Sequence, residues 1–66
     1  MLSARNQFKG VVKSVKLGGI MAEVVVAVGG LELVSAITRT SAEQLALKVG
    51  DEVTAVIKST EVIIDK

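Results

Sequence analysis

The sequence predicts a single domain that is mainly β-sheet, and three features of its 66 residues support that class. Valine and isoleucine, which favour strands, are frequent in the apolar runs. Glycine-containing pairs interrupt these runs at Gly18-Gly19, Gly29-Gly30 and Gly50-Asp51, as turns between strands do. Only one segment carries convincing helix signals. A chain of this length is expected to form one domain, residues 1–66.

Five strands are expected between and beyond the glycine turns. They span residues 6–17, 20–28, 31–38, 52–59 and 61–64. A short helix is expected at residues 41–47, between the third and fourth strands. Five short strands with one helix in that position are typical of a small, closed Greek-key barrel of the oligonucleotide/oligosaccharide-binding (OB) kind. This all-β, five-stranded OB-like barrel is the predicted fold class.

The start of the expected helix is rich in hydroxyl groups. Thr40 or Ser41 can serve as its N-cap, and Glu43 or Gln44 follows three residues later, as in a capping box. The first backbone N–H groups of a helix have no partner inside it, and the helix dipole adds a partial positive charge there. Such a helix start favours a bound oxyanion. The alternative is an ordinary capped helix whose spare donors bind water.

Both faces of the expected strands are apolar. In the second strand Val24 and Val26 share one face, while Met21 and Val25 lie on the other. A second apolar face implies a second buried surface, most simply a contact between copies of the chain. A domain this small also needs extra stabilisation, and the absence of Cys and His leaves no disulfide or zinc site to supply it. We therefore expect a homo-oligomer, although isolated apolar side chains are ordinary on protein surfaces.

The distribution of charge excludes several functions. The net charge is only +1. Among the basic residues of the first 22 positions, where no acid occurs, Lys9 and Lys13 are expected to lie on a solvated face. With one Phe and no Tyr or Trp, the chain offers no surface on which bases could stack, so nucleic acid is not an expected partner. The seven acids are scattered, and without His or Cys they form neither a metal cluster nor an acid–base pair. An enzyme is therefore not expected.

No segment of the sequence predicts a membrane span. The longest apolar run, residues 24–28, is far too short to cross a bilayer, and no apolar signal-peptide core follows the start. We therefore expect a cytoplasmic protein with no membrane partner.

Three segments combine positive charge with hydrogen-bond donors. They are Ser3-Ala4-Arg5 near the start, Thr40-Ser41-Ala42 at the helix and Lys58-Ser59 at the end of the fourth strand. Donors and cations without carboxylates are what a small, doubly charged tetrahedral oxyanion requires once water is removed from it. The sequence therefore predicts an oxyanion site and no site for a bare metal cation.

Motifs along essentially the whole chain carry a family resemblance. They are Ser3-Ala4-Arg5-Asn6-Gln7, residues 20–24, residues 36–41 and residues 50–62. In their order and spacing these motifs resemble the molybdate-binding Mop proteins (molbindins, of the Mop/TOBE group). The domain of that family also occurs in molybdate transporters and molybdate-responsive regulators.

The resemblance implies a hexamer, arranged as a trimer of dimers with strands exchanged or paired between subunits, and molybdate or tungstate bound between the subunits. It assigns Arg5 and Lys58 to charge neutralisation. It assigns directed hydrogen bonds to Ser3, Ser41 and Ser59, and backbone N–H donation to Ala4 and Ala42. Thr40 joins this set as a further candidate. A second class of site, on symmetry axes, is expected near Lys16, Gly19 and Ile20.

The function implied is intracellular binding and storage of molybdate or tungstate for homeostasis. Two alternatives remain open. One is a ligand-sensing module of a molybdate transport or regulation system, which the apolar outer faces would suit. The other is a nucleic-acid-binding OB barrel, which the basic first strand favours and the missing aromatic residues oppose.

Overall fold

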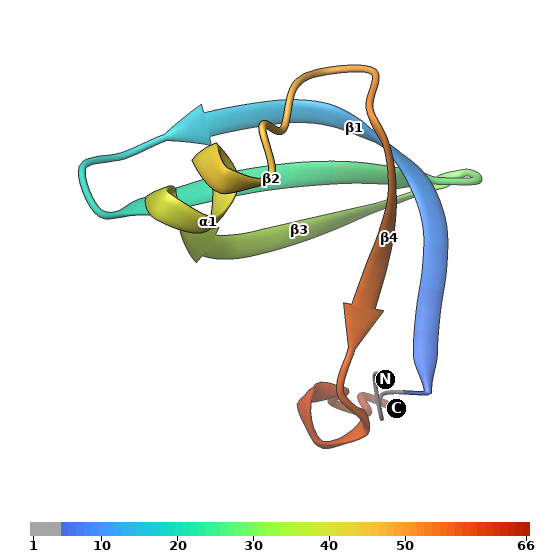
Figure 1. The fold of residues 1–66 in the computed structure, drawn as a ribbon. Coiled ribbons are helices and arrows are strands. Elements are labelled where there is room, and N and C mark those ends of the chain that lie inside the picture. Colours follow the sequence, from blue (N-terminus) through green and yellow to red (C-terminus); the bar gives the residue numbers. More distant parts are fainter. Residues whose placement is uncertain (1–4) are drawn as a thin grey trace.

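Four antiparallel strands form one sheet in the order β3-β2-β1-β4 in the computed structural model, which describes residues 5–66 (Figure 1). The strands are β1 (Asn6–Leu17), β2 (Met21–Val28), β3 (Leu31–Thr38) and β4 (Glu52–Ile57). A short helix, α1 (Arg39–Gln44), connects β3 to the segment before β4, and a single 3₁₀ turn, η1 (Ser59–Glu61), follows β4. The mainly β class and the helix between the third and fourth strands are as the sequence predicts.

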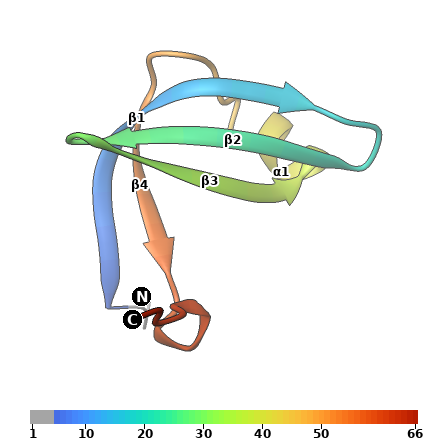
Figure 2. The same ribbon diagram turned by 180° about the vertical axis from the view of Figure 1, so that it is seen from behind.

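Strand β1 is long enough to serve two parts of the sheet. Residues 6–11 pair with β4, whereas residues 11–17 pair with β2. The register with β2 shifts between Val12 and Ser14, which is a β-bulge, and bulges bend the strand that carries them. Figures 1 and 2 show the result, a sharply curved β1 from which β4 runs at a steep angle to β2 and β3.

The concave face of this bent sheet holds the core. Val12, Val24 and Val26 are almost fully buried and form its centre. Five half-buried side chains pack against them, namely Val15, Val28, Ile37, Leu47 and Val53. The strand register accounts for this arrangement, because Val12 pairs with Val26 and Val15 with Val24 on the same face.

The opposite face of β2 and β3 is also apolar, in line with the alternation in the sequence. Val25 pairs with Val34 across the two strands, and Met21 lies farther along the same face. Val34 is 67% exposed and Met21 is 48% exposed. The isolated chain therefore presents to solvent apolar side chains that a partner surface would bury.

The sheet does not close into a barrel within one chain, and the expected fifth strand at residues 61–64 is not formed. Glu61 ends η1, and residues 62–66 have no strand pairing. Ile63 is 91% and Ile64 85% exposed. The physical reason is that a strand exists only where an edge accepts its hydrogen bonds. Val62 lines a hollow with Leu33 of β3 and Ile57 of β4, but its segment forms no ladder with either strand.

The unclosed barrel leaves an apolar groove between its two edge strands. The groove has a volume of about 320 Å³ and runs from Leu33 and Ile37 of β3 to Ala55 and Ile57 of β4, with Val24 at its base. In residues 5–66, no helix is both long enough and apolar enough to cross a membrane.

Candidate functional site

Helix α1 begins two residues earlier than the sequence predicts, because Thr38 is its N-cap. The Thr38 Oγ1 atom accepts a hydrogen bond from the Ser41 backbone N–H at 3.1 Å, and the Thr38 hydroxyl donates to Ser41 Oγ at 2.8 Å. Thr38 ends β3 in an extended conformation, the backbone geometry that an N-cap needs. The expected caps at Thr40 and Ser41 are therefore wrong. Thr38 is a good N-cap residue as well, so residue type alone did not distinguish it from the other two.

The expected capping box is also absent from this helix. Glu43 does not reach back to the N-cap, and its Oε2 atom instead lies 3.7 Å from Arg39 Nε, as an i,i+4 ion pair. Gln44 is the last helical residue. The helix ends there, short of the predicted residue 47, because Ala46 adopts a left-handed φ of 51°.

The three predicted residues of α1 differ in what they offer a ligand. Thr40 is exposed, and Ser41 is half-buried with its hydroxyl oriented by Thr38. Ala42 is 2% exposed and is the fourth helical residue, where the backbone N–H normally pairs with the N-cap carbonyl. Ala42 thus anchors the helix by packing, and the accessible hydroxyls belong to the two residues before it, Thr40 and Ser41. We call Thr40, Ser41 and Ala42 the helix half-site.

The other predicted residues lie where β1 and β4 end together. Asn6 pairs with Ile57, and its side-chain Nδ2 donates to the Ile57 carbonyl at 3.2 Å. This pairing places Arg5 beside Lys58, one residue beyond each strand. Both residues are exposed, as is Ser59, the first residue of η1. We call Arg5, Lys58 and Ser59 the terminal half-site; the predicted Ser3 and Ala4 lie outside the described residues.

The two half-sites lie at opposite ends of β1. The terminal half-site adjoins Asn6, whereas α1 follows Thr38, which pairs with Met21 near the Leu17 end. A straight strand of 12 residues spans about 36 Å. Although β1 is curved, both views show α1 beside the β1–β2 turn, whereas β1 starts and η1 lies at the far end of β4 (Figures 1 and 2). One chain therefore does not bring the predicted residues together.

The residues of the expected second site lie next to the helix half-site. Lys16 is near the end of β1, and Gly19 and Ile20 belong to the turn that leads into β2. The Ile20 side chain is 81% exposed, while its carbonyl accepts a hydrogen bond from the Arg39 N–H at 2.7 Å. This contact between the turn and the helix start was not predicted, because it joins segments that lie about 20 residues apart in the sequence.

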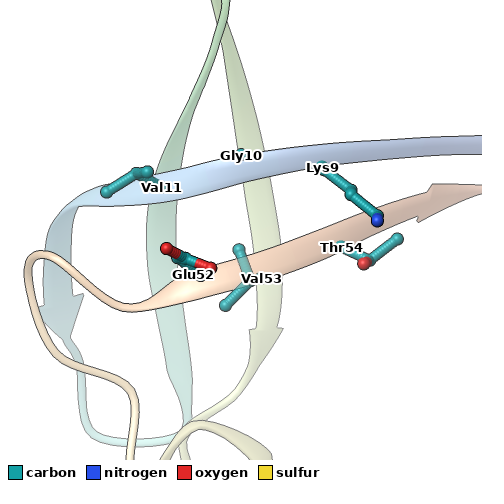
Figure 3. Close-up of a pocket in the computed structure, with 6 residues that line it drawn as sticks. All are labelled: Lys9, Gly10, Val11, Glu52, Val53 and Thr54. Atoms are coloured by element: carbon teal, nitrogen blue, oxygen red, sulfur yellow. The ribbon is translucent and has the colours of Figure 1, made fainter.

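Two hollows of the described structure were candidates for a ligand site, and neither joins the half-sites. Figure 3 shows the first, a hollow of about 460 Å³ between β1 and β4, in which Lys9 and Thr54 are register partners and Glu52 is also part of the lining. A lining with one ammonium and one carboxylate is a poor match for a dianion, because the carboxylate repels it. The second is the apolar groove, whose lining has no charged side chain. Within residues 5–66, no group of three or more acidic, His or Cys side chains is placed to hold a metal ion.

Comparisons with known proteins agree on one family. The family model described as the TOBE domain matches residues 2–64. Molybdenum-pterin-binding protein 1 of Clostridium pasteurianum is 53% identical over 64 residues, which cover 96% of this chain and 94% of that protein. The structure of a molybdate-binding protein from Sporomusa ovata superposes with a TM-score of 0.95 at 42% identity, and the match covers 100% of this chain and 98% of that one.

A third similar protein, the cytoplasmic molybdate-binding protein ModG, was solved with molybdate bound. It superposes with a TM-score of 0.90 at 42% identity, over 96% of this chain and 45% of its own. At 42% identity, both solved structures resemble this chain in sequence as well as in fold.

Proposed function

The chain belongs to the TOBE domain family, and we propose that it binds molybdate or tungstate at contacts between copies of itself and stores the anion inside the cell. The molybdate-binding neighbours support the choice of ligand. The role is binding without catalysis, and the ModG neighbour supports a cytoplasmic location.

One observation supports a site between subunits, namely the separation of the two half-sites along β1. The terminal half-site contributes two cations, Arg5 and Lys58, together with Ser59, and the helix half-site contributes the hydroxyls of Thr40 and Ser41. A dianion that leaves water needs both neutralising charge and directed donors, because unpaired burial of charge is costly. The terminal half-site of one copy, placed against the helix half-site of another, meets both needs.

We assign each residue a role in that shared site. Arg5 and Lys58 neutralise the charge, with Arg5 presenting a planar fork of donors. Hydroxyl donors come from both sides, namely Ser3, Ser59, Thr40 and Ser41. Backbone N–H groups come from Ala4 and the first turn of α1, which Ala42 anchors by packing. Lys16, Gly19 and Ile20 form a second class of site close to the helix half-site.

The exposed apolar surfaces support oligomerisation. The groove between β3 and β4 has no covering strand, while Val62, Ile63 and Ile64 extend unpaired and exposed. A pair related by a two-fold axis buries the same surface twice and, if the half-sites meet, completes two equal anion sites. We propose that such dimers assemble into a hexamer, with strands exchanged or paired between subunits.

Anion-dependent thermal unfolding tests the ligand. Since the anion binds only the assembled protein, it stabilises that form by about 2.7 kcal/mol at about a hundredfold excess over the Kd. The unfolding midpoint is expected to rise with molybdate or tungstate and much less with sulfate or phosphate. A midpoint that none of the four anions changes would remove the storage function.

A complementation experiment tests the shared site. Arg5→Ala removes a cation from the terminal half-site, and Ser41→Ala removes a hydroxyl from the helix half-site but keeps the cap, which uses the Ser41 backbone N–H. Each variant alone is expected to bind molybdate weakly. In a co-refolded equal mixture, about a quarter of the sites combine two intact halves and regain wild-type affinity. If each site lay within one chain, every site in the mixture would stay defective.

A further inference from the structure

Arg39 joins the helix start to the β1–β2 turn by contacts from both its backbone and its side chain. Its N–H donates to the Ile20 carbonyl at 2.7 Å, and its Nη1 donates to the Gly18 carbonyl at 3.1 Å. Its Nε lies 3.7 Å from Glu43 Oε2. One residue thus connects both ends of the turn to the first helical turn.

The position of Arg39 in the chain gives these contacts their importance. It lies directly between Thr38, which orients the Ser41 hydroxyl, and Thr40 of the helix half-site. Strand β2 starts directly after the turn, with Met21 paired to Thr38. A shift of the turn relative to α1 would therefore also shift the hydroxyls that face the ligand. Thr38 and Arg39 hold that geometry from opposite sides.

The guanidinium is suited to this connection and is already occupied by it. A planar fork can donate to a carbonyl through one edge while another N–H faces a carboxylate, whereas a lysine ammonium presents a single point of contact. Its contacts with Gly18 and Glu43 direct the Arg39 side chain toward the turn and toward its own helix.

We infer that Arg39 is a positioning residue that couples the β1–β2 turn to the helix half-site, so that anion binding at Ser41 and the conformation of residues 18–20 depend on each other. This inference rests on the proposed function. The coupling is reciprocal. An ordered turn raises the affinity for the anion at Ser41, and an anion bound at Ser41 favours the ordered turn by the same factor.

The affinity of Arg39 variants for molybdate, measured by titration calorimetry on the full chain, tests the inference. Arg39→Ala is expected to raise the Kd about tenfold, which corresponds to about 1.4 kcal/mol. Arg39→Lys keeps the charge but loses the fork, and it is expected to remain several-fold weaker than wild type. Lys48→Ala, which removes an exposed cation outside both half-sites, serves as the matched charge control and is expected to change the Kd by less than about twofold.

A second measurement separates positioning from a general loss of stability. In the wild type, the amide resonances of Gly18, Gly19 and Ile20 are expected to shift on molybdate addition with the same midpoint as Ser41. In Arg39→Ala the Ser41 resonance should still respond at higher molybdate, while the turn no longer follows it. A loss of stability alone would shift both sets equally.

Several results would overturn the inference. Arg39→Ala with an unchanged Kd would do so, as would Arg39→Lys with wild-type affinity, since charge alone would then suffice. Turn resonances that still follow Ser41 in Arg39→Ala would also overturn it. If the wild type bound no molybdate, the proposed function would fail along with the inference, whereas any of the first three results would leave that function intact.

Discussion

Gly10 shows how a single residue sets the shape of the sheet. A Cβ atom at this position would lie 2.5 Å from the Ala27 carbonyl oxygen and 2.8 Å from a Val26 methyl group. Gly10 lies where β1 passes from its pairing with β4 to its pairing with β2. The absence of a side chain therefore lets β1 pass close to β2 at the bend.

Gly10→Ala is expected to lower the free energy of unfolding by about 2 kcal/mol or more, because forcing a methyl group into a packed site costs about 1–3 kcal/mol. The matched control is Gly30→Ala, since a Cβ there meets nothing within 4 Å and the change should stay within about 0.5 kcal/mol. Urea unfolding at one fixed protein concentration measures both. Equal stability of the two variants would contradict this reading of the bend.

For the start of the helix, the sequence predicted the correct kind of residue as N-cap, a hydroxyl side chain, but not its position. The hydroxyl-rich segment does start a helix, but the cap is Thr38. Propensity alone could not decide among Thr38, Thr40 and Ser41, since all are good N-caps. The end of β3 determines which residue is the N-cap. Pairing with Met21 keeps Thr38 extended, and the helix starts at the next residue.

At the level of elements, α1 depends on its caps because it is only six residues long. Isolated helices of this length are not stable in water. Its N-terminus is held by the Thr38 hydroxyl, and at its C-terminus the Leu47 N–H donates to the Ala42 carbonyl and the Ala46 N–H to the Glu43 carbonyl. These two bonds form a Schellman motif around the left-handed Ala46. The helix start keeps its geometry because both ends are fixed.

Thr38→Ala is expected to cost about 1 kcal/mol of stability through loss of the N-cap. It should also weaken molybdate binding, since the Ser41 hydroxyl loses its partner. Thr40→Ala removes the same atoms from an exposed helical position and should change stability by less than about 0.5 kcal/mol. Thermal or urea unfolding of the two variants gives the comparison. A Thr38→Ala variant as stable as Thr40→Ala would show that the cap is not needed.

The strands were predictable to different degrees. Glycine turns bounded β1 and β3 at their observed limits and β2 within one residue, since hairpins are set by local sequence. Residues 61–64 have the composition of a strand and yet do not form one, since a strand also needs an edge within reach. The bulge between Val12 and Ser14, which bends β1, left no signal that the sequence analysis detected.

At the scale of the whole molecule, the described structure is an open four-stranded sheet that keeps the two half-sites apart. Only five of residues 5–66 are buried, and the exposed apolar side chains include Leu31, Val34 and Ile63. The predicted oxyanion ligands divide between two ends of β1. Sequence identified which residues offer donors and charge, but it could not indicate their separation, because that depends on the path of β1. We propose that a second copy of the chain covers the exposed apolar surface and brings the two half-sites together.

Native mass spectrometry across a molybdate titration tests this central claim most directly. Bound molybdate is expected only on oligomers, and added molybdate is expected to shift the distribution away from monomer. A monomer that carries molybdate with the affinity of the oligomer would contradict it, since a single chain would then complete the site without a partner.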